Sequence, residues 1–198
     1  MNFYQLTFIF FTYLVAAIPF GLVLSLTIAK KDIRKLGSGN IGATNVTRNC
    51  GKLLGFLTLI LDGLKGAIMV ILAQACFGKA ANFEVFVSVV GAAAVIGHIF
   101  PVYLKCKGGK GVATTIAVLV AINPFVGLFT CLSWLAIFIF TRTVSIASIA
   151  AILSTLGFVF YIGETNSQIL LVTLLAFLIV VRHLENIKRI LNNEEAKL

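Results

Sequence analysis

Charge is scarce in this chain. Of its 198 residues only 12% are charged and 60% are hydrophobic, and the mean hydropathy is +1.05. Soluble domains carry about 25% charged residues. The composition therefore excludes an ordinary soluble domain and indicates an integral membrane protein. The chain also lacks a low-complexity linker and a visible internal repeat, so we expect one domain over residues 1–198.

Candidate metal ligands and catalytic carboxylates are also few. The chain has two histidines and seven Asp and Glu residues. None of the four cysteines has the spacing of a metal site: Cys50, Cys76, Cys106 and Cys131. We expect free thiols, because two of them lie in basic loops that would face a reducing cytosol. No Ser-His-Asp set is evident, and we expect no metal, no cofactor and no nucleic-acid partner.

Long apolar runs divide the chain into spans. The first runs from about Phe3 to Ala29, with Pro19 inside it, which membrane helices tolerate. Further spans are expected at 53–76, 83–104, 112–122, 124–140, 144–162 and 167–181. The run from Val112 to Phe140 is split at Asn123 because a residue before proline disfavours helix.

The basic residues test this count. With seven spans, 14 of the 16 Lys and Arg residues lie on one side, at 30–52, 105–111, 142 and 182–198. Basic loops favour the cytoplasmic side. Six spans would put the tail across from the other basic loops, and five would fuse 144–181 into one overlong span. We therefore expect an all-α polytopic integral membrane protein with seven transmembrane helices, the N-terminus outside and the C-terminus in the cytoplasm.

A lysine- and glycine-rich stretch follows the third span. It contains Lys105, Lys107, Gly108, Gly109, Lys110 and Gly111. Glycine permits positive φ and a close backbone approach, successive N–H groups can form an anion nest, and lysine suits phosphate. A basic loop beside a membrane needs lysine but not Gly-Gly-Lys-Gly, so phosphate binding is favoured. The stretch is not a P-loop, because Leu104 and Gly111 stand at two of that motif's defining positions.

Two more polar segments would lie on the same face. The first is glycine-rich and offers Ser38, Asn40, Thr44, Asn45 and Arg48. The second offers His183 and Asn186, which we expect on one face of a continuing helix. Glu185 is expected to be structural, in an ion pair with Arg189 or Arg182. The basic residues beside His183 should keep its imidazole neutral.

Three ionisable residues lie away from these loops. Asp62 and Lys65 are spaced i,i+3 inside a span, where they should face the bundle and pair with each other. Both a structural ion pair and a functional one fit this pattern. His98 ends an apolar helix, and we expect it to be packed or helix-capping rather than catalytic.

The three polar segments resemble a known family. Residues 38–48, 97–114 and 183–189 are similar to the three cytoplasmic motifs of the bacterial acyl-phosphate:glycerol-3-phosphate acyltransferases, the PlsY family, and 62–66 is similar to its second helix. The resemblance covers nearly the whole chain. Cys106 departs from the pattern, since an aromatic residue is usual there.

The resemblance implies transfer of a fatty acyl group from acyl phosphate to the 1-hydroxyl of glycerol 3-phosphate, the first acylation of phospholipid synthesis. The products are 1-acylglycerol 3-phosphate (lysophosphatidic acid) and phosphate. It places the site at the cytoplasmic face of the bacterial inner membrane, with a functional link to the enzyme that makes acyl phosphate. The residues that it assigns to catalysis are Ser38, Arg48, His183 and Asn186. It assigns the glycines of 108–111 to acyl phosphate, and Asn40, Thr44, Asn45 and the lysines at 105, 107, 110 and 188 are further expected substrate contacts.

Two other classes of protein remain in competition. An anion transporter would place polar groups near the bilayer midplane, where only Asp62 and Lys65 lie here. A lipid-binding scaffold would need the basic face alone, which leaves Asn45, His183 and Asn186 unexplained.

Overall fold

The protein is described by a computed structural model that covers residues 1–197. The regular structure in these residues is helical. They are α1 (Phe3–Ala16), α2 (Phe20–Thr27), α3 (Ala43–Cys50), α4 (Lys52–Phe77), α5 (Phe83–Ile99), α6 (Val112–Ile122), α7 (Pro124–Thr141), α8 (Val144–Tyr161), α9 (Asn166–Arg182) and α10 (Leu184–Leu191). Short 3-10 turns lie at Ile33–Lys35 and Val102–Leu104.

The expected class, an all-helical membrane protein, is confirmed. Five helical segments in the described residues are long and apolar enough to cross a membrane, counting Phe3–Thr27 as one. A sixth appears if α9 and α10, which meet at 55°, are counted as one broken span. Helix α6 is apolar but has only 11 residues. Seven spans and their orientation therefore stay predictions.

Local signals explain why several expected bounds are close to the observed ones. Helix α6 ends at Ile122, and Pro124 starts α7, where its missing N–H costs nothing. The Asn123 side chain caps α7 by accepting from the N–H groups of Phe125 and Val126.

One expectation about helices was refined and one was wrong. The first apolar run is one candidate span, Phe3–Thr27, as expected, but its helix breaks between Ala16 and Phe20, at the position of Pro19. The segment expected as a polar loop before α4 contains helix α3, over Ala43–Cys50. That helix packs along the start of α4, so tertiary contact forms it in spite of its Thr and Asn content.

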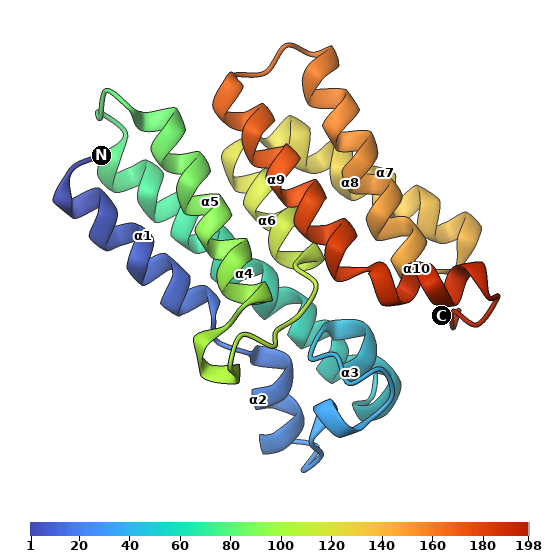
Figure 1. Ribbon diagram of the computed structural model, residues 1–198. Helices are drawn as coiled ribbons and strands as arrows, with labels where there is room; N and C mark the ends of the chain where they lie inside the picture. The colour runs from blue at the N-terminus through green and yellow to red at the C-terminus, as the bar shows by residue number, and fades with distance from the viewer. Residues whose placement is uncertain (198) are drawn as a thin grey trace.

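The helices form a bundle with two distinct ends (Figure 1). The N-terminus and the connections α4–α5 and α8–α9 lie at one end. Helices α2, α3 and α10, the connection α5–α6 and the C-terminal tail lie at the other, which we call the α10 end. All three polar segments singled out in the sequence therefore lie at one end of the bundle.

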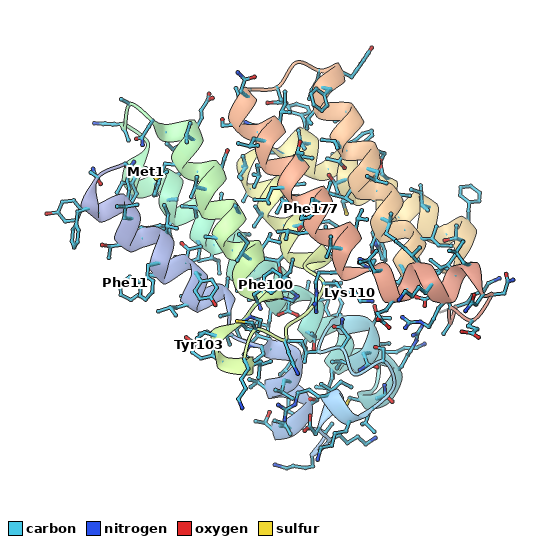
Figure 2. The ribbon with its side chains drawn as sticks, in the orientation of Figure 1. Met1, Phe11, Phe100, Tyr103, Lys110 and Phe177 are labelled. Carbon is cyan, nitrogen blue, oxygen red and sulfur yellow. The ribbon has the colours of Figure 1, made fainter. Side chains whose placement is uncertain are left out.

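Helix α5 lies at the centre of the bundle, and apolar rings cover the outside. Eleven of the 17 residues of α5 are buried, including His98 near its end. By contrast, Phe11 and Phe177 are 55% and 64% exposed and lie on the outer surface (Figure 2). An exposed apolar surface of this kind suits contact with lipid.

Candidate active site

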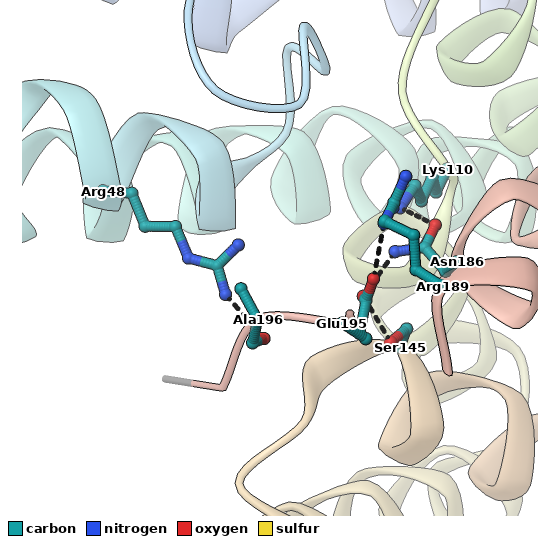
Figure 3. A network of polar contacts seen from close by, with 7 residues as sticks. All are labelled: Arg48, Lys110, Ser145, Asn186, Arg189, Glu195 and Ala196. Carbon is teal, nitrogen blue, oxygen red and sulfur yellow. Dashed lines mark hydrogen bonds and ion pairs between the residues drawn. The ribbon is translucent and has the colours of Figure 1, made fainter. Parts of the chain in front are cut away.

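Cationic and polar side chains converge at the α10 end where the tail folds back (Figure 3). We call this group the anion cluster: Lys110, Ser145, Asn186, Arg189 and Glu195. One oxygen of the Glu195 carboxylate accepts from Ser145 Oγ at 2.7 Å and from Asn186 Nδ2 at 2.6 Å. Arg189 Nε donates to the other oxygen at 2.8 Å, and Lys110 Nζ donates to Asn186 Oδ1. Donors from α8 and α10 thus surround one carboxylate, and Lys110 joins the group through Asn186.

The tail also reaches the first polar segment. Arg48, near the end of α3, donates from Nη2 to the Ala196 carbonyl at 3.0 Å (Figure 3). Arg48 is otherwise an exposed side chain. The tail therefore bridges α3 to the anion cluster.

The cluster changes the ionisation of its own members. Burial is the main cause that lowers the pKa of Lys110 from 10.5 to about 8, and the Glu195 carboxylate opposes that shift. Burial raises the pKa of Glu195, but hydrogen bonds from Ser145, Arg189 and Asn186 outweigh it and the net shift is downward. At neutral pH the cluster therefore holds an ionised carboxylate beside a cationic lysine.

His183 lies under this cluster, between α9 and α10. Its side chain is 2% exposed, and its Nδ1 lies 2.8 Å from the carbonyl of Ile179. Because a carbonyl can only accept, Nδ1 carries a hydrogen and Nε2 of the neutral ring is an acceptor. Burial, and next the charge of Lys110, lower the pKa of His183 to about 4. The ring is neutral as expected, but its neighbours in sequence are not the main cause.

The third polar segment was expected to continue the preceding helix, and it does not. The chain bends by 55° between α9 and α10, at His183. Asn186 lies in the first turn of α10 and points its amide at Lys110 and Glu195. His183 and Asn186 therefore belong to one site without sharing a straight helix face.

The glycine-rich stretch 105–111 is built differently from the expected nest. The N–H groups of Gly108 and Gly109 donate to the carbonyls of Ile99 and His98, at 3.1 and 3.2 Å, and so face the protein. Of the three glycines only Gly111 has positive φ, at 85°, where α6 begins. Glycine is required at 108 and 109 mainly by close packing against the end of α5.

The first polar segment is held together by one asparagine. Asn45 is 4% exposed, and its amide nitrogen donates to the carbonyls of Ile33, Leu36 and Asn40. Its Oδ1 accepts from the Ser38 N–H at 3.3 Å. Asn45 was predicted to contact substrate. Its hydrogen bonds instead hold this loop together from inside.

Other expected site residues lie nearby but outside the cluster. Within residues 1–197 no hydrogen bond joins these to the cluster: Ser38, Asn40, Thr44, Lys105, Lys107 and Lys188. Glu185 is exposed and makes no ion pair in the same range, so the expected pairing was wrong. Arg189 pairs with Glu195 instead, at 2.8 Å.

The predicted ion pair inside the bundle is present. Lys65 Nζ lies 2.9 Å from Asp62 Oδ1, and their side chains are 3% and 4% exposed. Lys65 also donates to the Ile18 carbonyl, at the break between α1 and α2, at 2.7 Å. His98 Nδ1 lies 3.6 Å from the same Asp62 oxygen. The second histidine is thus buried, as expected, and lies beside a carboxylate without a hydrogen bond to it.

Sequence reasoning missed four residues of the site, one of which, Arg189, was considered only as a partner of Glu185. Ser145 was absorbed into an apolar span, although its place after Arg142 puts it at the α10 end. Arg182 donates to the carbonyls of Gly108 and Gly109, a contact that no local pattern indicates. Glu195 lies in a short acidic tail and meets Ser145 across 50 positions in the chain. Among the described residues no group of three or more potential metal ligands lies close together.

Comparison with known proteins gives one consistent result. A family model described as glycerol-3-phosphate acyltransferase matches residues 6–193. Glycerol-3-phosphate acyltransferases of Aquifex aeolicus (strain VF5) and Ehrlichia canis (strain Jake) are 43% and 39% identical, over 94% and 100% of this chain and 95% and 100% of their own lengths.

Solved structures agree. Two crystal structures of PlsY (YgiH), an integral membrane glycerol 3-phosphate acyltransferase, match with TM-scores of 0.91 and 0.88 at 42% and 41% identity. They are the glycerol 3-phosphate form and the lysophosphatidic acid form, and each match covers 98% of this chain and 95% of the other. The chain belongs to the glycerol-3-phosphate acyltransferase family of integral membrane enzymes.

Proposed function

We propose that this glycerol-3-phosphate acyltransferase takes its acyl group from acyl phosphate and attaches it to the 1-hydroxyl of glycerol 3-phosphate. The products are lysophosphatidic acid and inorganic phosphate. The observation that carries the proposal is the anion cluster, where Asn186 and Arg189 already donate to a carboxylate and Lys110 donates to Asn186 beside them. A phosphate group has the same need for cationic and N–H donors. An enzyme that makes acyl phosphate must supply the donor.

In this proposal the protein acts by binding and orientation. Lys110, Arg48 and Asn186 hold the phosphate groups of the substrates, and Ser38 lies on the loop that α3 and Asn45 support. The mixed anhydride is already activated, so no covalent enzyme intermediate is needed. Placing two bound substrates in line can remove about 7–11 kcal/mol of the barrier. Stabilising the charge that develops on the leaving phosphate adds to this effect.

The proton of the attacking hydroxyl needs an acceptor. His183 has a pKa of about 4, so it is a weak base at neutral pH. Its Nε2 can accept a hydrogen bond and thereby orient the hydroxyl of glycerol 3-phosphate. A phosphate oxygen, with a second pKa near about 6 by analogy with phosphoserine, accepts the proton. The new ester C–O bond forms as the bond between the acyl carbon and the phosphate oxygen breaks, and phosphate leaves with its electron pair.

The acyl chain needs an apolar place beside the cluster. A small cavity between α6, α7, α8 and α9 is lined by Val112, Ile116, Ile152 and Ile179, among others. Val112 follows Gly111 directly, and Ile179 is the residue whose carbonyl holds His183. At about 10 Å³ the cavity holds no more than about one water, so α6 to α9 would have to part before an acyl chain could enter beside Lys110 and His183.

The membrane arrangement is part of the same proposal. We count α6 and α9 as spans, which gives seven with the N-terminus outside and the α10 end in the cytoplasm. The basic residues of 30–52, 105–111, 142 and 182–197 support this orientation. Residues 1–198 then form a single domain in the bacterial inner membrane, and the phosphate groups of both substrates bind at its cytoplasmic face.

The direct test uses purified protein in detergent or liposomes. Palmitoyl phosphate and glycerol 3-phosphate are supplied together, and lysophosphatidic acid is measured against palmitoyl-CoA as the alternative donor. We expect product with acyl phosphate and none with acyl-CoA. Product from acyl-CoA alone would overturn the proposed donor, and no product from either would overturn the proposed reaction.

A further inference from the structure

A buried polar chain leads from the middle of the bundle to the glycine-rich stretch. It begins at Lys65, continues through Asp62 on the same helix and passes to His98 on α5. Asp62 and His98 are 3% and 5% exposed. Thr114, in the first turn of α6, donates from Oγ1 to the Asp62 carbonyl at 2.8 Å. The chain therefore ties α4, α5 and α6 together directly below residues 105–111.

The imidazole of His98 lies against the backbone of Gly109. A Cβ added at Gly109 would lie 2.0 Å from His98 Nε2 and 2.8 Å from its Cε1, and its third contact is also with that ring. The Gly109 N–H donates to the His98 carbonyl at 3.2 Å. Gly109 is thus a glycine because the His98 ring fills the space where a side chain would begin.

The neighbouring glycine is confined in another way. A Cβ added at Gly108 would lie 2.2 Å from the His98 carbonyl oxygen and 2.7 Å from that of Ile99. It would also meet Pro101. These obstacles are backbone and a proline ring, so truncating the His98 side chain would not remove them. Substituting each glycine in turn therefore distinguishes crowding by the His98 ring, at Gly109, from crowding by backbone atoms and Pro101, at Gly108.

The residue that follows Gly109 is the cation of the anion cluster. Lys110 reaches Asn186, while Arg182 holds the Gly109 carbonyl from the other side at 3.3 Å. Gly109 is therefore clamped between the His98 ring and the Arg182 guanidinium. A shift of Gly109 toward or away from the ring would move the Lys110 ammonium with it.

We propose that His98 is a positioning residue: its ring, buried beside Asp62, supports Gly109 and so fixes where Lys110 meets the phosphate of acyl phosphate. This inference rests on the proposed function. His98 touches no reacting atom in it and acts only through Gly109 and Lys110. A role limited to helix packing would not distinguish one substrate from the other.

The test is a double-mutant cycle on Gly109→Ala and His98→Ala. Gly109→Ala should raise the KM for acyl phosphate by about tenfold or more, because small displacements of binding groups are costly. His98→Ala should raise the same KM and leave the KM for glycerol 3-phosphate unchanged. The double variant should recover toward His98→Ala alone, since the added methyl then occupies the space of the lost ring.

Gly108→Ala is the matched control, because its obstacles are backbone atoms and Pro101. His98→Ala should not rescue it. Rescue of both glycine variants, or of neither, would overturn the inference, as would an equal rise in both KM values for His98→Ala. If Gly109→Ala does not fold, the yield and thermal unfolding of the double variant become the readout, with Gly108→Ala again as control. Wild-type protein that makes no lysophosphatidic acid would count against the proposed function instead.

Discussion

Two groups of charges in this protein are neutralised in opposite ways. In the bundle, Asp62 and Lys65 are 2.9 Å apart on one helix, and both side chains are at most 4% exposed. At the α10 end, Glu195, which comes from the tail after α10, forms an ion pair with Arg189 and acts electrostatically on Lys110. The first anion is built into a helix, whereas the second lies on a segment without regular structure.

Under the proposed function, this difference separates a structural site from a binding site. Buried charges without partners are strongly unfavourable, so the ion pair in α4 must stay intact. The anion cluster is partly exposed, and in the proposed function a substrate phosphate displaces its carboxylate without opening a helix. An exchangeable anion among fixed donors is what a phosphate-binding enzyme requires.

The largest expected effect comes from breaking the closed pair. Lys65→Met leaves Asp62 buried without its main partner, which should cost about 3–5 kcal/mol of unfolding free energy. The double variant Asp62→Asn with Lys65→Met removes both charges and should be clearly more stable than the single one. Denaturant unfolding in detergent measures this. If Lys65→Met is as stable as wild type, His98 alone is enough to compensate the buried charge of Asp62.

A smaller effect is expected at His183. His183→Gln keeps a hydrogen-bonding side chain but removes the imidazole, so the KM for glycerol 3-phosphate should rise about two- to tenfold, the worth of a hydrogen bond between neutral groups. Steady-state kinetics with each substrate varied in turn gives the two KM values. A fall in kcat by about 10²–10⁴-fold at unchanged KM would make His183 the general base instead.

The open cluster should respond to pH. Lys110 has a pKa lowered by burial to about 8, so it is mostly charged at neutral pH and loses its proton as pH rises. The charged fraction falls about tenfold between pH 7 and pH 9, and the KM for acyl phosphate should rise by up to that factor. Lys110→Arg stays charged throughout, so its KM should be flat over this range. The same rise of KM in Lys110→Arg would mean that a group other than Lys110 titrates.

The sequence predicts the region around the Asp62–Lys65 pair better than the α10 end with its anion cluster. The ion pair follows from i,i+3 spacing inside an apolar run, and the bounds of α6 and α7 follow from Asn123 and Pro124. These are local signals, each acting over a few residues.

The open region depends on contacts between distant segments. Helix α3 has poor intrinsic propensity and forms against α4, which local pattern cannot indicate. Glu195 meets Ser145 only because the tail folds back after α10. The bend at His183 likewise separates two residues that the 3.6-residue period places on one face.

The smallest expected effect tests whether the open anion is exchangeable. Glu195→Gln keeps the size of the side chain and removes the charge that competes with substrate phosphate for Lys110 and Arg189. The KM for acyl phosphate at pH 7 should therefore fall by about two- to fivefold, since each donor contributes only part of the binding energy. Glu194→Gln is the matched control, because Glu194 is exposed and the same charge is lost one position away. Glu195 also raises the pKa of Lys110, so the pH at which KM begins to rise should move lower in Glu195→Gln alone. A higher KM in this variant, with no change in Glu194→Gln, would mean that the tail carboxylate organises the donors rather than competing for them, and the contrast between a closed and an open anion site would fail.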